Sequence, residues 1–374
     1  MIWPKVARLW VLALMVACAP SQAAAPNEFT PTAQPVNPVS LPRPTITPAP
    51  TVAATPTPIP IPTTAPTPAP TLRQLTSGGC CVQPFWSPDG SEVWFIDKPG
   101  EDSPSGIWAV NLVGGPPRLV TERVGLFSPD LKLAAYPERG QTYIERLGGE
   151  RWTAPSGGRA ISFSPDSQKI LWQAASSSEN LDRRVVEVWM ANVDGGDPQP
   201  VARLIGGGVS GWFPDGQRLL VSGRESAASD SFLAALNLAD GSLTEIARGP
   251  RLRGGALSPA GGRAAYQITF SGDPALDGLW LARTDGNGAR RLEIFGAYRW
   301  RSEEKLLVIP LEADGASHWL LEVDAETGAV RALIDPAVTP FRVAVGDWAP
   351  SPDGRHIVFV SADDHNLWVM NLPP

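Results

Sequence analysis

The chain has 374 residues, and its 38 Asp and Glu against 31 Lys and Arg give a formal net charge of −7 and a pI near 5.1. Proteins that bind nucleic acid normally carry a basic surface, so this balance argues against DNA or RNA as a partner. The 40 Pro, 36 Gly and 14 Trp, beside only 4 Met, favour turns and strands over helices and predict an all-β protein.

Residues 1–17 have the pattern of a secretory signal peptide. Lys5 and Arg8 supply a positive start, and the apolar run from Leu9 to Ala17 is too short to span a bilayer. The run Met15-Val16-Ala17-Cys18 resembles a bacterial lipoprotein signal, which implies that Cys18 is lipidated. Signal cleavage after the alanines at 23–25, without a lipid, is the alternative. A lipid would hold the exported protein on a membrane of the cell envelope, facing the periplasm or the cell exterior.

Residues 18–71 are predicted to be a disordered linker. From Pro26 to Thr71 the segment is rich in Pro and Thr and has no Gly, as in Thr55-Pro56-Thr57-Pro58. Proline cannot donate to a strand ladder, and such repeats favour polyproline II. We expect a semi-stiff spacer that separates the membrane from a folded domain at 72–374.

A turn motif recurs through that domain. Its first copy is Trp86-Ser87-Pro88-Asp89-Gly90, and each copy is followed by an apolar run. Ser, Pro, Asp and Gly suit successive positions of a type I turn between two strands. The serines of the motif, or their equivalents, stand at 87, 128, 164, 213, 258 and 351. The last gap is about twice the others, and the segment Tyr298–Glu304 supplies a degenerate copy within it.

The spacing therefore indicates seven units, each of which cannot bury its apolar face alone. The first unit shows four strand-like runs, at Val82–Trp86, Glu92–Ile96, Ile107–Asn111 and Arg118–Thr121. The prediction is a seven-bladed β-propeller of four-stranded antiparallel blades, and six or eight blades fit the spacing less well.

The two ends of the domain complement each other. The chain reaches Pro374 after the third strand of the last unit, and Arg73-Gln74-Leu75-Thr76 resembles a fourth strand. Unpaired strand edges invite aggregation, so we expect this N-terminal strand to close the ring. A loose N-terminal segment is the alternative.

These repeats resemble the TolB-like propeller family, with its WD-like repeats, over residues 72–374. The resemblance rests on Ser-Pro-Asp-Gly turns such as Ser87–Gly90 and Ser351–Gly354, each with its following strand. It implies a propeller that serves as a binding scaffold or as an accessory domain of a peptidase. The TolB arrangement of six blades with a second domain differs from the seven units counted here, so the family's partners are not carried over.

Long, irregular loops are expected on one end of the ring, between the second and third strands of each unit, and we expect this end to bind a partner. The alternative is that insertions are merely tolerated at this end and bind nothing.

Four arginines are candidate site residues at the same end of the ring. Arg123, Arg159 and Arg253 stand five residues before a motif serine or its equivalent, and Arg342 has a looser match. Equivalent positions in a ring converge, so these arginines are candidates to bind a carboxylate or phosphate at the channel mouth. Solvated arginines, or partners for acidic residues of neighbouring blades, are the alternatives.

Cys80 and Cys81 are adjacent, and in an oxidising compartment they favour a vicinal disulfide. Two free thiols or an intermolecular bridge are the alternatives, and no His at ligand spacing supports a metal site.

No catalytic motif and no cofactor motif is recognised in the sequence. The sequence thus favours a non-catalytic envelope propeller that binds a protein, peptide or glycan. Two alternative hypotheses remain. One is a propeller-type glycan hydrolase or lyase, and the other is a structural envelope protein without a ligand.

Overall fold

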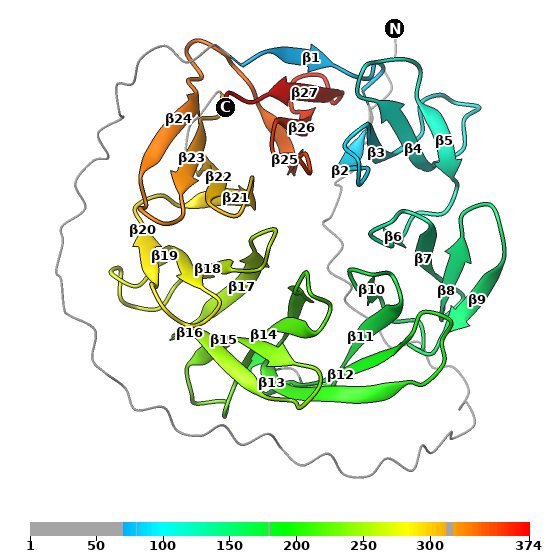
Figure 1. The fold of residues 1–374 in the computed structure, drawn as a ribbon. Helices are drawn as coiled ribbons and strands as arrows, with labels where there is room; N and C mark the ends of the chain where they lie inside the picture. The colour runs from blue at the N-terminus through cyan, green and yellow to red at the C-terminus, as the bar shows by residue number, and fades with distance from the viewer. Residues whose placement is uncertain (1–69, 80, 179, 312–316) are drawn as a thin grey trace, which may run out of the picture. The chain divides into compact units, whose positions relative to one another are not determined.

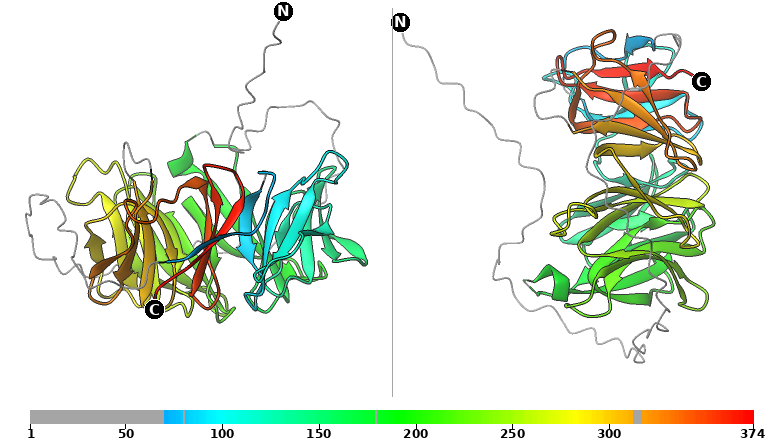
Figure 2. Two further views of the ribbon diagram at one scale, coloured as in Figure 1. Left: turned by 90° about the horizontal axis from the view of Figure 1, so that it is seen from above. Right: turned by 90° about the vertical axis from the view of Figure 1, so that its left-hand side faces the viewer.

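The structure is a computed structural model that describes residues 70–79, 81–178, 180–311 and 317–374. Its sheets are arranged around a ring, with β2 (Val82–Trp86), β6 (Leu126–Phe127), β10 (Ile161–Phe163), β17 (Leu252–Leu257), β21 (Gly296–Trp300) and β25 (Val343–Pro350) nearest the centre (Figure 1). Figure 2 shows the ring edge-on, with the strands running between its two ends. The described part of the chain is an all-β propeller.

Four of the sheets are antiparallel meanders of four consecutive strands. Beyond their innermost strands they contain β3 (Glu92–Asp97), β4 (Gly106–Asn111) and β5 (Arg118–Thr121); β7 (Leu133–Glu138), β8 (Gln141–Arg146) and β9 (Arg151–Ala154); β18 (Arg263–Ile268), β19 (Gly278–Arg283) and β20 (Arg290–Leu292); and β22 (Lys305–Pro310), β23 (Leu320–Asp324) and β24 (Val330–Ile334). The strands predicted for the first unit agree with β2 to β5 within one residue at each end, because both the turn residues and the apolar runs are strong there.

A fifth four-stranded sheet joins the two ends of the domain. Its order is β1-β27-β26-β25, with β1 (Leu72–Gln74) pairing in antiparallel register with β27 (Leu367–Asn371), next to β26 (His356–Ser361). The buried Leu75 follows β1 and packs in one cluster with residues of β26 and β27. The Thr76 hydroxyl accepts a hydrogen bond of 2.9 Å from the Leu367 amide. The pairing of an N-terminal strand with the last unit is therefore present.

The predicted count of seven four-stranded blades is wrong. The structure has five four-stranded blades and one seven-stranded sheet, which contains β10, β11 (Lys169–Ala175), β12 (Val185–Asn192), β13 (Gln199–Trp212), β14 (Arg218–Arg224), β15 (Ser231–Asn237) and β16 (Leu243–Gly249). The physical reason lies in β13, which runs for 14 residues without a break.

Strand β13 pairs with β12 through its first part and with β14 through its second. The register shifts between Ile205 and Gly208, where Gly206 takes a φ of +61°. Glycine adopts this left-handed conformation at little steric cost, so the backbone bends there and passes from β12 to β14 within one strand. The link expected between the third and fourth units is therefore absent, and the two units share one sheet.

The apolar core lies between neighbouring sheets rather than inside any one of them. One cluster joins Leu307 and Leu320 to Trp348 and Phe359, and so holds the sheet of β21 to β24 against the closing sheet. Because each sheet buries its faces only against its neighbours, the stability of each depends on the continuity of the ring.

Candidate functional site

The two ends of the ring differ in structure. The turn face carries the tight turns between the first and second and the third and fourth strands. The link face carries the other connections. It comprises the loops 98–105, 225–230 and 269–277, and residues 176–178 and 180–184 between β11 and β12. The links between sheets on this face are 122–125, 155–160, 250–251, 293–295 and 335–342. The long second-to-third loops were predicted, although the loop between β7 and β8 is only a two-residue turn at 139–140.

The turn face is held by a repeated hydrogen-bond pattern. In its first copy Ser87 donates to Asp89 at 2.6 Å and accepts from the Glu92 amide at 2.9 Å. Asp89 also accepts from the Ser91 amide at 3.0 Å. The Ser87 hydroxyl, followed by the Ser91 amide, lowers the pKa of Asp89 to about 2. The motif that identified the repeat therefore has a structural role, because these groups satisfy one another within the turn.

The link face carries nearly all of the exposed large apolar side chains. Among the described residues, Phe270 is 79% exposed in the loop after β18, and Val345 is 100% exposed in the link-face half of β25. The others on this face are Val82, Val124, Leu126, Leu181, Phe295, Leu311 and Val338, whereas only Val113 lies on the turn face. Apolar side chains gathered at one end of a molecule indicate a contact surface.

Backbone strain coincides with two of these side chains. Phe270 and Val345 have φ values of +55° and +50°. Left-handed backbone is uncommon for residues other than Gly, Asn and Asp, and it is a clear outlier for a β-branched residue. Such strain occurs preferentially at functional sites. On the link face, two exposed apolar side chains therefore stand on left-handed backbone, which costs free energy.

Two clefts lie along the innermost strands. The β17–β21 cleft has a volume of about 480 Å³ and is lined by Ala256, Leu257, Gln267, Gly296, Ala297, Tyr298, Arg299, Trp300 and Pro350. The β10–β13 cleft is smaller, about 320 Å³, and its lining includes Arg159, Ser162, Trp172 and Gln173. Both clefts place one arginine beside polar and aromatic side chains.

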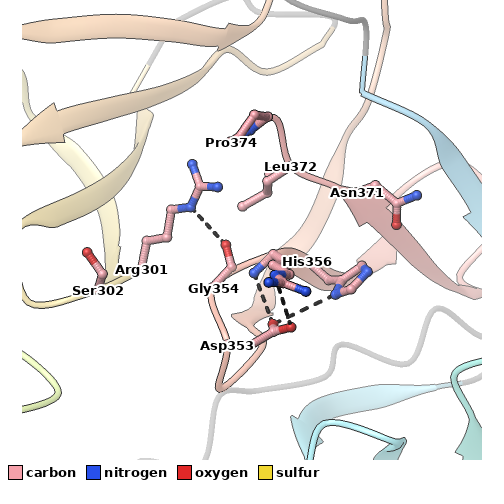
Figure 3. A pocket seen from close by; sticks show the side chains of 9 residues that line it. Arg301, Ser302, Asp353, Gly354, His356, Asn371, Leu372 and Pro374 are labelled. Carbon is pink, nitrogen blue, oxygen red and sulfur yellow. Dashed lines mark hydrogen bonds and ion pairs between the residues drawn. The ribbon is translucent and has the colours of Figure 1, made fainter.

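A larger cleft, of about 670 Å³, lies on the turn face (Figure 3). Its lining side chains include Arg301 and Asp353, and they are already engaged with protein groups. Arg301 donates to the Gly354 carbonyl at 2.8 Å, and Asp353 accepts from the Ser351 hydroxyl at 2.6 Å. This cleft therefore belongs to the turn framework.

The four predicted arginines all lie at the link-face ends of innermost strands. Arg123, Arg159 and Arg342 stand in links, and Arg253 is the second residue of β17. Three have local partners. The Arg123 guanidinium lies 5.4 Å from the centre of the Tyr136 ring, Arg159 donates to the Ser156 carbonyl at 2.9 Å, and Arg342 lies 3.1 Å from Asp363. No described contact joins any two of the four, so their common ligand stays a prediction.

Arg299, Tyr298 and Gln267 of the β17–β21 cleft were not among the predicted site residues. The sequence contained a signal for the first two, because they belong to the degenerate copy of the motif at Tyr298–Glu304. Gln267 carried no such signal, since only the pairing of β17 with β18 brings it beside Arg253.

Cys18 and Cys80 lie outside the described residues, so the predicted lipidation and vicinal disulfide stay predictions. Cys81 is buried, with its Sγ 3.3 Å from the Thr76 hydroxyl. The described residues contain no group of three or more His, Cys, Asp or Glu side chains placed to hold a metal ion. None of the described segments forms a helix with the length and apolarity that a membrane crossing requires.

No protein-family model matches the chain, and no curated protein matches its sequence. The fold is similar to that of oligogalacturonate lyase from Vibrio parahaemolyticus, with a TM-score of 0.59 and 11% identity over 82% of this chain and 97% of that one. An oligogalacturonate lyase in complex with manganese gives a TM-score of 0.56 and 15% identity, over 81% of this chain and 91% of that one.

A putative TolB from Agrobacterium tumefaciens also matches, with a TM-score of 0.41 and 17% identity, over 69% of this chain and 94% of that one. At these identities the two lyases show that the fold is a β-propeller and nothing about activity. The propeller fold that the TolB-like resemblance implied is present in the described residues, and membership of that family stays a prediction.

Proposed function

We propose that this chain is an exported, lipid-anchored, non-catalytic propeller that binds a protein, peptide or glycan partner at the cell envelope through its link face. The observation that carries the proposal is the gathering of exposed large apolar side chains on that face, since among the residues that the structure describes only Val113 lies on the turn face. The envelope location comes from the signal-like residues 1–17 and from Cys18.

The positions of Phe270 and Val345 provide a sharp test. Aspartate accepts left-handed backbone better than Phe or Val, so Phe270→Asp and Val345→Asp should leave the fold intact while placing a charge on the contact surface. Val113→Asp is the matched control, because Val113 is 90% exposed on the turn face.

The experiment is chemical cross-linking of the full-length chain in the cell envelope, with the products compared among wild type and the three variants. We expect one cross-linked partner in wild type and Val113→Asp that is lost in Phe270→Asp and Val345→Asp. Equal cross-linking in all four proteins would refute the link face as the docking surface.

A glycan lyase or hydrolase is the second candidate, because two of the similar solved structures are oligogalacturonate lyases. Most glycoside hydrolases use two carboxylates across the substrate. The innermost strands are β2, β6, β10, β17, β21, β25 and the part of β13 from Gly206 onward. Among their described residues Asp347 is the one acidic residue, and it accepts a hydrogen bond from the Gln83 amide at 3.0 Å. Cleavage of oligogalacturonate by the wild type, lost in Asp347→Asn, would favour the enzyme over the binding module.

A further inference from the structure

The β17–β21 cleft brings hydrogen-bond donors from three strands to one wall of the ring. Arg253 of β17 is the direct register partner of Gln267 of β18. Directly paired residues in an antiparallel ladder project to the same side of the sheet. Gln267 lines the cleft, so the Arg253 side chain leaves the backbone on the side of the cleft.

Tyr298 of β21 extends toward the same place. A Cβ at Gly254, the residue after Arg253, would lie 3.8 Å from the Tyr298 hydroxyl. Burial raises the pKa of Tyr298 despite the opposing charge of Arg299, so the hydroxyl stays protonated at neutral pH and is able to donate. Next to it, the exposed Arg299 lines the cleft with its guanidinium 5.5 Å from the centre of the Trp348 ring.

The positive charge of this cleft is not balanced by a carboxylate of the chain. Many other arginines of the described residues pair with Asp or Glu, as Arg248 does with Glu245 at 2.6 Å and Arg331 with Glu322 at 2.8 Å. Arg253 and Arg299 have no carboxylate of a described residue within ion-pair distance, and no acidic side chain lines the cleft. Arg299 donates one hydrogen bond of 2.9 Å to the Tyr298 carbonyl. Its remaining N–H groups in the cleft, and the Arg253 guanidinium beside the cleft, therefore have no carboxylate of a described residue as a partner.

The rest of the lining indicates what kind of anion fits. The buried Trp300 ring is fixed by a hydrogen bond of 2.9 Å from its indole nitrogen to the Ala256 carbonyl. Pro350, Leu257 and Ala297 add further apolar surface. Such walls suit an organic body, which inorganic phosphate lacks. A guanidinium group matches the two coplanar oxygens of a carboxylate, while Tyr298 and Gln267 are suited to neutral hydroxyl or amide groups.

We propose that the β17–β21 cleft binds the carboxylate of a small organic acid, with Arg253 and Arg299 on the carboxylate and with Tyr298 and Gln267 on its neighbouring polar groups. The same chemistry is offered by a sugar acid and by an acidic amino-acid residue. The inference does not depend on the partner of the link face, because small acids test the cleft without that partner.

The test is a calorimetric titration of the full-length protein with glucuronate and with N-acetylaspartate. Each acid is compared with its neutral amide, glucuronamide or N-acetylasparaginamide, and inorganic phosphate is titrated separately. We expect at least one acid to bind. Its amide should bind at least about tenfold more weakly, because hydrogen bonds to charged groups are strong. Binding of the acid should weaken as salt is raised.

Arg253→Gln and Arg299→Gln should each weaken binding of the acid by about tenfold. Arg203→Gln is the control, since Arg203 is exposed on the part of β13 that pairs with β12 and should leave affinity unchanged. The Arg299 guanidinium also lies over the Trp348 ring, so Arg299→Gln could lower the stability of the fold as well as the affinity. In that case the affinity of Arg253→Gln decides the test.

Preference for one acid would identify the source of the carboxylate. Equal affinity for acid and amide, binding that neither variant weakens, or no binding of either acid at millimolar concentration would overturn the proposal. Tighter binding of phosphate than of either acid would also overturn it.

Discussion

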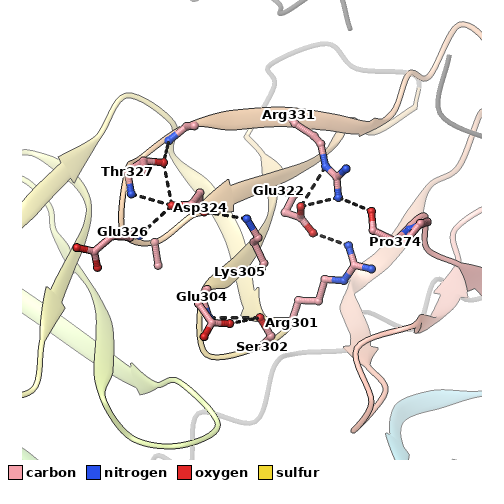
Figure 4. A network of polar contacts seen from close by, with 12 residues as sticks. Arg301, Ser302, Glu304, Lys305, Glu322, Asp324, Glu326, Thr327, Arg331 and Pro374 are labelled. Atoms are coloured by element: carbon pink, nitrogen blue, oxygen red, sulfur yellow. Dashed lines mark hydrogen bonds and ion pairs between the residues drawn. The ribbon is translucent and has the colours of Figure 1, made fainter. Parts of the chain in front are cut away.

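Glu322 is the acidic residue whose neutralisation should cost the described structure most. It is 4% exposed on β23 and forms ion pairs with two arginines (Figure 4). Arg301 donates to it from the degenerate turn, and Arg331 of β24 donates to it at 2.8 Å. The same arginines donate to the Pro373 carbonyl at 2.7 Å and to the Pro374 carbonyl at 2.9 Å. Glu322 therefore holds the pair of side chains that fix the C-terminal residues.

The perturbation is Glu322→Gln, which keeps the shape and removes the charge. The Arg301 side chain is only 11% exposed, so it would lose its carboxylate in a poorly solvated place. Removing one partner of a buried ion pair costs roughly 3–5 kcal/mol. Arg331 is 37% exposed and can be solvated, so we expect the lower end, about 3 kcal/mol. For a domain of this size that corresponds to a fall in Tm of about 5 °C.

Thermal unfolding followed by circular dichroism, with urea unfolding at 25 °C, measures both quantities. Glu293→Gln is the control, because Glu293 is 69% exposed beside Arg291 and its exposed ion pair should contribute less than about 1 kcal/mol. A Tm for Glu322→Gln within about 1 °C of that of the control would refute the reasoning, since the buried pair would then contribute no more than an exposed one.

Two further predictions concern the closure of the ring and the repeated turn. Deleting residues 72–76 removes β1 and the buried Leu75, whose truncation alone should cost about 2–5 kcal/mol, so unfolding should shift well below the wild-type Tm. An unchanged melting curve would contradict closure by β1.

The pKa of Asp89 and that of Asp166 are lowered in the folded state, in both cases first by a serine hydroxyl, so their hydrogen bonds stabilise the fold at neutral pH. That contribution should be lost as pH falls from about 4 toward 2, as urea unfolding at several pH values would show, and Ser87→Ala should flatten the profile. A profile that Ser87→Ala leaves unchanged would argue against the serine as the cause.

The local elements followed from the sequence because their causes are local. The Ser-Pro-Asp-Gly turns are satisfied within five residues, as Ser87, Asp89 and Glu92 show, so a single copy fixes its turn and the strand after it. The pairing of β1 with β27 was also predictable, because an incomplete last unit and a spare N-terminal strand were both visible.

The number of separate blades was decided only by the tertiary structure. Whether β13 breaks or bends at Gly206–Gly208 depends on how well its two halves pair with β12 and β14, and sequence spacing does not report pairing between strands. The candidate site was decided in the same way. Gln267 and Tyr298 line one cleft although they come from different strands, and only the register of β17 with β18 puts Arg253 on the same side of the sheet as Gln267. Turn chemistry acts over a few bonds and can be read along the chain, whereas a binding site is a property of residues that meet only when the ring has formed.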